Sequence, residues 1–70
     1  MQQYTKIRKY TMEIGTKAYS VYKITDEEGC IFFSLDCGKY ELIKSRSEDE
    51  TTAFLNGILC LAHNLGLKVK

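Results

Sequence analysis

Apolar residues between positions 47 and 66 recur with the spacing of an α-helix. At 100° per residue they form one stripe along the helix, with Leu59 at its edge. The members of the stripe are Phe54, Leu55, Ile58, Leu61, Ala62 and Leu65. The pattern predicts one amphipathic helix whose apolar stripe is buried against the rest of the chain.

Both ends of this helix carry sequence signals. Ser47 and Glu50 have the spacing of a capping box. In this motif the Ser47 hydroxyl accepts from the Glu50 amide, and the Glu50 carboxylate reaches back toward the Ser47 amide. Gly66 supplies the left-handed conformation that commonly ends a helix, and Leu67 is placed to fold back onto Leu61 or Ala62. The helix should therefore begin after Ser47 and end before Gly66.

The chain before the helix alternates in the manner of β-strands separated by turns. We expect strands over residues 4–14, 18–25, 30–36 and 40–44, with a further short strand at 67–70. The parity of the apolar positions changes within residues 4–14, which indicates either one strand with a β-bulge or two short strands. Ile31, Phe33 and Leu35 should face the helix. The predicted fold is α+β, an antiparallel meander of three to four strands with the C-terminal helix packed across one face.

Length and charge restrict the functions that the chain can have. The 70 residues make one small domain, and the net charge of +1 gives no overall field that would recruit nucleic acid or membrane. The charge is nevertheless uneven along the chain. Residues 1–24 carry five bases and one acid, a net of +4, whereas residues 25–50 carry three bases and eight acids, a net of −5. Without a leader or an apolar span, we expect a cytoplasmic protein with free cysteines.

The sequence offers no catalytic, cofactor or metal site. Cys60 and His63 lie three residues apart on the predicted helix, but they have neither a pocket nor an oxyanion donor. Cys30 and Cys37 are too widely spaced for a zinc knuckle, and Cys60 should point away from the strands. We therefore expect no metal, no cofactor and no enzymatic activity.

A protein partner is the expectation that remains. Tyr22 and Phe32 should emerge on the sheet face that the helix leaves open, which would make an aromatic contact surface. The acidic turn formed by Asp26, Glu27 and Glu28 is a second candidate contact. We predict a binding or regulatory domain, such as an inhibitor or adaptor of phage or mobile-element type. The alternative for the aromatic rings is that they simply cover their strand neighbours.

Two other functions stay open. Aromatic and basic residues interleave on the first strands, the combination with which sheet surfaces bind single-stranded RNA or DNA. The candidate nucleic-acid residues are Tyr4, Lys6, Arg8, Lys9 and Tyr10. Four of these, all except Lys9, share one parity and thus potentially one face. A homodimer formed through the aromatic face or a free strand edge is the third possibility.

Overall fold

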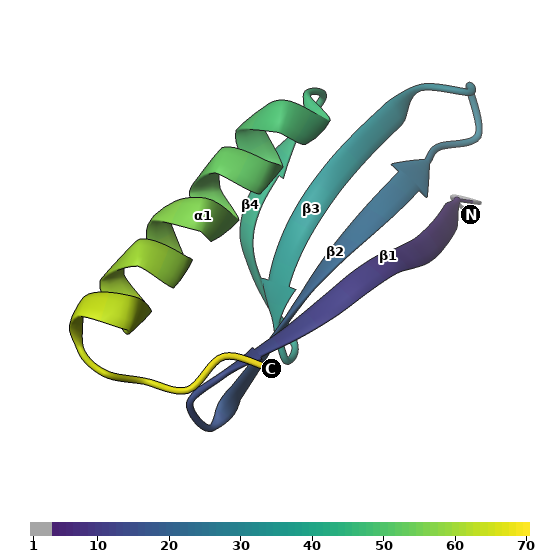
Figure 1. Ribbon diagram of the computed structural model, residues 1–70. Helices are drawn as coiled ribbons and strands as arrows, with labels where there is room; N and C mark the ends of the chain where they lie inside the picture. The colour runs from purple at the N-terminus through teal and green to yellow at the C-terminus, as the bar shows by residue number, and fades with distance from the viewer. Residues whose placement is uncertain (1–3) are drawn as a thin grey trace.

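In the computed structural model, which describes residues 4–70, four antiparallel strands form one sheet and a helix lies against it (Figure 1). The elements are β1 (Thr5–Ile14), β2 (Lys17–Thr25), β3 (Ile31–Cys37), β4 (Tyr40–Ser45) and α1 (Glu48–Asn64). The strand order in the sheet is β1-β2-β3-β4. The predicted α+β meander with a C-terminal helix is therefore confirmed.

The predicted bulge lies in β1. Arg8 pairs with Tyr22 and Tyr10 pairs with Val21, so Lys9 is the extra residue between them. This insertion reverses the facing of the residues that follow it, which explains the change of apolar parity in the sequence. A second irregularity interrupts the pairing of β3 with β4, beside Leu35.

The ends of α1 use the predicted caps with one change. The Ser47 hydroxyl accepts from the Glu50 amide at 3.3 Å. The Glu50 carboxylate, however, accepts from the Ser45 hydroxyl at 2.7 Å, and the Ser45 oxygen accepts from the Ser47 amide at 3.0 Å. Ser45 thus mediates the reciprocal half of the capping box. At the other end the Leu67 amide donates to the Ala62 carbonyl at 2.9 Å and Gly66 has φ +74°, as in a Schellman cap.

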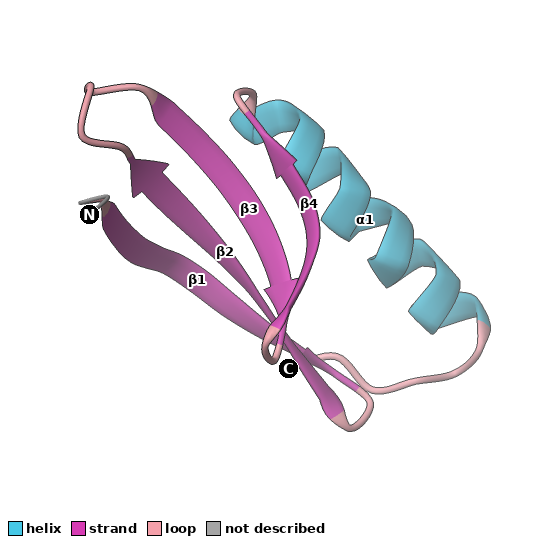
Figure 2. Cartoon of the chain, turned by 180° about the vertical axis from the view of Figure 1, so that it is seen from behind, coloured by secondary structure: helices cyan, strands magenta, loops and turns pink. Residues whose placement is uncertain are grey.

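The sheet has two unlike faces. Val21 and Leu35 pair directly and pack with Leu55 of the helix, so they define the helix-side face. Because successive residues of a strand point to opposite faces, Tyr22 and Ser34 lie on the other side, here called the open face. Seen from behind, this sheet has α1 beside β4 and β1 at the far edge (Figure 2).

The helix covers only part of the helix-side face. It packs against β3 and β4, and its buried residues are Thr51, Leu55 and Ala62. The expectation that the whole apolar stripe is buried was wrong, because Phe54, Leu61 and Leu65 are 43%, 61% and 66% exposed. Leu61 and Leu65 line a pocket between the helix and the β1–β2 hairpin.

The C-terminal segment returns to the β1–β2 hairpin. Val69 forms an isolated antiparallel bridge with Ile14, and the Lys70 amide donates to the Glu13 carbonyl at 2.8 Å. The predicted fifth strand is therefore reduced to one bridge, which ties the chain end to the sheet. No helix within residues 4–70 has the length and apolar character needed to cross a membrane.

Candidate interaction surface

The open face gathers most of the residues that the sequence singled out. The pairings of Lys6 with Ile24 and of Ile24 with Phe32 place these three in one row across the sheet. The next row contains Arg8, Tyr22, Ser34 and Lys44. The two predicted binding sets therefore meet in part on one surface, since Tyr22 and Phe32 are neighbours of Lys6 and Arg8 there.

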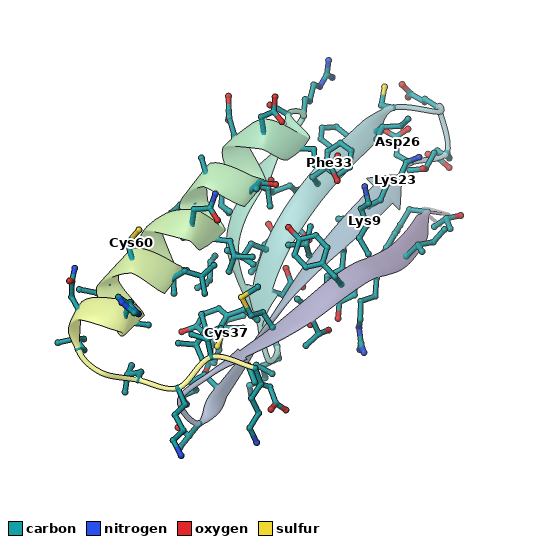
Figure 3. The ribbon with its side chains drawn as sticks, viewed as in Figure 1. Lys9, Lys23, Asp26, Phe33, Cys37 and Cys60 are labelled. Carbon is teal, nitrogen blue, oxygen red and sulfur yellow. The ribbon has the colours of Figure 1, made fainter. Side chains whose placement is uncertain are left out.

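Lys9 and Tyr10 lie on the opposite face. The bulge turns Tyr10 toward the row of Val21, and the Lys9 ammonium lies 5.6 Å from the centre of the Phe33 ring. Lys9 also forms an ion pair with Glu48 at the start of α1. Figure 3 shows Lys9 and Phe33 on the side of the sheet where the helix lies. The common face expected for the strand's basic and aromatic residues therefore extends only as far as Arg8.

Cations of the chain itself lie over the rings of the open face. The Lys6 ammonium is 4.5 Å and the Arg8 guanidinium 5.8 Å from the centre of the Tyr22 ring. Lys44 and Arg46 lie 5.0 Å and 5.3 Å from the centre of the Phe32 ring. These separations are within the range of cation–π attraction. The rings are consequently part of a mixed surface rather than a bare apolar patch.

Beneath these side chains the open face buries two polar residues. Ser34 is fully buried and Asp36 is 7% exposed, although no helix or strand within residues 4–70 covers this side. One Asp36 oxygen accepts from Lys6 Nζ at 2.9 Å. The other Asp36 oxygen, Oδ1, and Ser34 Oγ have no hydrogen-bond partner among the described residues. The open face therefore holds buried polar atoms, Asp36 Oδ1 and Ser34 Oγ, whose hydrogen bonds residues 4–70 do not supply, which is unusual at a buried position.

The Lys6–Asp36 pair has an electrostatic consequence. The hydrogen bond to Asp36 raises the pKa of the Lys6 ammonium above its ordinary 10.5, against a smaller opposing effect of burial. Lys6 therefore remains charged throughout the physiological range. It neutralises a carboxylate thirty positions away in the chain and joins β1 to β3 across β2.

A pocket of about 470 Å³ opens at the end of this face beside the β2–β3 turn. Ile24, Phe32 and Tyr4 supply its apolar surface, and Lys6 and Lys44 also reach it. Its carboxylates come from Asp26, Glu27, Glu28 and Glu41. Four acids against two bases give the pocket a net charge of −2. The acidic turn and the aromatic face, which the sequence suggested as separate contacts, therefore border the same cavity.

Backbone amides of the β2–β3 turn fix the Asp26 side chain. Asp26 Oδ1 accepts from the amides of Glu28 at 2.9 Å and Cys30 at 2.8 Å, which is an Asx-type turn. Gly29 follows with φ +86°, a left-handed conformation that residues with a side chain rarely adopt. Asp26 is thereby fixed in place, whereas the carboxylates of Glu27 and Glu28 are exposed to solvent.

Sequence reasoning missed several members of this surface. Lys44, Arg46 and Glu41 lie in or after β4, and the irregular pairing beside Leu35 hides their facing from a simple count of parity. Asp36 was expected at the end of the third strand, as it is, but the sequence did not mark it as a member of this surface. One sequence signal could have placed Lys44 on this face. It lies in a predicted strand that returns antiparallel to the strand containing Phe32.

Cys37, Cys60 and His63 lie apart from this surface, whereas Cys30 directly follows the β2–β3 turn and donates its amide to Asp26. Cys60 is exposed on the outer side of α1, and Cys37 lies at the end of β3 (Figure 3). Among residues 4–70 no three His, Cys, Asp or Glu side chains are grouped so that they could hold a metal ion. The candidate functional chemistry of the described chain is therefore that of its open face.

Comparisons of the chain with protein-family models, with curated proteins and with solved structures gave no match.

Proposed function

We propose that this chain is a non-enzymatic protein-interaction domain whose open face binds a basic segment of a partner protein. The observation that carries the proposal is the pocket beside the β2–β3 turn, where an aromatic and aliphatic floor is rimmed by four carboxylates. Lys and Arg side chains combine an apolar stem with a charged head, so they complement such a pocket. The apolar lining and the net negative charge of the pocket together favour a basic side chain as the anchor.

The charges that the chain supplies internally support this choice. Lys6 is engaged with Asp36 and with the Tyr22 ring, and Lys44 lies over Phe32. By contrast, Glu27, Glu28 and Glu41 form no ion pair with another described residue. The negative charge of the pocket is therefore the part that remains available to a partner, and it would also attract that partner from a distance.

A second candidate is the binding of single-stranded nucleic acid. It is favoured by the four cations that surround the rings of Tyr22 and Phe32. Base stacking would require these cations to leave the ring faces, and phosphates would meet the carboxylates of the pocket. Protein binding is the better-supported function for these two reasons.

Fluorescence anisotropy with three labelled probes separates the candidates. The probes are a Lys/Arg-rich peptide, an Asp/Glu-rich peptide of the same length and a mixed-sequence single-stranded RNA. We expect binding of the basic peptide only. Binding of the RNA that weakens steeply between about 50 and 200 mM salt would establish the second candidate instead.

Matched charge variants locate the contact. Glu28→Gln and Glu41→Gln each remove one carboxylate from the pocket, whereas Glu13→Gln removes one from the far end of the open face. Because exposed ion pairs contribute little each, we expect each pocket variant to weaken peptide binding by about 2- to 5-fold. The Glu13 variant should bind like the unmodified protein. Equal weakening by all three variants would mean that only net charge matters and would overturn the pocket assignment.

A further inference from the structure

The helix-side face offers a second surface, independent of the open face. Between α1 and the β1–β2 hairpin lies an apolar groove with a pocket of about 290 Å³. Ile58, Leu61 and Leu65 line it from the helix, and Ile14 and Tyr19 line it from the sheet. Burial raises the pKa of the Tyr19 phenol, with Cys37 beside it acting in the same direction. The groove continues the core outward and is not filled by residues 4–70.

Two apolar surfaces flank the groove, one on α1 and one on the sheet. The exposed flank of α1 is an apolar ridge made of Phe54, Leu61 and Leu65. The uncovered part of the sheet is an apolar shelf on which Ile7, 57% exposed, and Tyr10 project beside Met12. A ridge and a shelf on one molecule can each pack against the other on a second molecule related by two-fold symmetry.

The accessible surface of the chain is larger than that of a compact monomer of its mass. The accessible surface is 5216 Å², whereas a compact monomer of 8.0 kDa exposes about 4450 Å². The excess of about 770 Å² matches the roughly 800 Å² that one partner buries in a standard stable interface. The radius of gyration of 13.1 Å is likewise larger than the roughly 11 Å of a compact 70-residue domain.

We infer that a second copy of this chain occupies the groove and forms a two-fold symmetric dimer. In this dimer the ridge of each protomer packs on the shelf of the other. The apolar residues buried inside one protomer are few, namely Ile14, Val21, Ile24, Leu35, Leu55 and Ala62. A dimer that extends this core across the symmetry axis compensates for the small size of each subunit. It leaves both open faces accessible, so the inference does not depend on the proposed function.

Analytical ultracentrifugation over a dilution series tests the dimer with two matched variants. Leu61→Glu places a charge on the ridge, and Leu42→Glu places one on β4, outside the groove, at another exposed leucine. We expect the unmodified protein and the Leu42 variant to dimerise. The Leu61 variant should raise the dissociation constant about 30-fold or more, as expected for the loss of an interface anchor.

The alternatives give different results. A protein that stays monomeric up to NMR concentrations overturns the inference, as does a dimer that the Leu61 variant keeps and the Leu42 variant loses. Circular dichroism checks that both variants fold, and Leu61→Ser with Leu65→Ser replaces the first variant if it does not. In a mixed isotope-labelled sample, intermolecular NOEs between the Leu61 methyl groups and the Tyr10 ring are expected. Intermolecular NOEs that instead link the Tyr22 and Phe32 rings would place the dimer on the open face and overturn the proposed geometry.

Discussion

Three consecutive residues of β3 are buried, yet they are buried in two different ways. Leu35 points to the helix-side face and packs with Val21 and Leu55 in an apolar core. Its neighbours Ser34 and Asp36 point to the open face, where long basic and aromatic side chains cover them. The difference shows that burial alone does not mark a core, since one face excludes water by apolar packing and the other retains unsatisfied polar atoms.

Among the substitutions that compare the two faces, we expect the largest loss of stability at Leu35, in the apolar core. Leu35→Ala leaves a cavity in the centre of the core, and such substitutions cost about 2–5 kcal/mol in the free energy of unfolding. Chemical denaturation followed by circular dichroism measures the loss. Leu42→Ala, at an exposed leucine, should change stability by no more than about 0.5 kcal/mol. Equal losses at the two leucines would mean that the apolar core is not centred on β3.

On the open face the largest effect is expected at Lys6. Lys6→Met leaves the Asp36 carboxylate buried without a partner, and we expect a loss of about 1–3 kcal/mol. Arg8→Met removes a cation from the same strand and face but breaks no ion pair with a described residue, so it should be nearly neutral. If denaturation shows the two variants to be equally stable, Asp36 does not depend on Lys6.

Alkaline pH tests the same pair. Because the pKa of Lys6 is raised by its hydrogen bond to Asp36, its contribution to stability is complete below pH 10.5 and disappears as pH rises through the raised value. Stability of the unmodified protein should therefore fall in that range. The fall should be shallower for Lys6→Met, while Tyr19, whose pKa is also raised, contributes equally to both proteins. Parallel curves for the two proteins would contradict this account.

The smallest effect is expected at Ser34. Its hydroxyl is buried and makes no hydrogen bond with a described residue, so Ser34→Ala removes an unsatisfied group. We expect stability to stay unchanged or to rise by up to about 1 kcal/mol. A thermal melt compared with that of Thr11→Ala, which breaks the 2.9 Å hydroxyl contact with Ser20 on the same face, provides the control. A destabilised Ser34 variant would show that this hydroxyl has a partner after all.

Local structure was predictable because its signals are local. The Ser47 cap, the Gly66 stop and the turn at Asp26 depend on residues within a few positions of each other, and each forms largely as expected. Alternation in β3 likewise identified Leu35 as facing the helix. The bulge in β1 was one of two structures expected from the change of parity, and its position at Lys9 was not predicted.

The surfaces were less predictable because they depend on contacts between distant residues. Periodicity placed Leu61 in the apolar stripe, but it could not show that the helix packs mainly against β3 and β4 and leaves Leu61 exposed. Asp36 is paired with Lys6 of β1, thirty positions away in the sequence, and Ser34 is buried on the same face. The acidic turn and Phe32 share a pocket through the geometry of the sheet edge, which alternation does not encode.

The most direct test of the proposed function is amide chemical-shift mapping of the labelled protein during a titration with the Lys/Arg-rich peptide. The account predicts saturable shifts at Glu28, Phe32 and Glu41 around the pocket, with Leu61 and Leu65 on the opposite side unchanged. Shifts centred on the helix flank, or no saturable shifts at all, would contradict the proposal that the open face binds a basic partner.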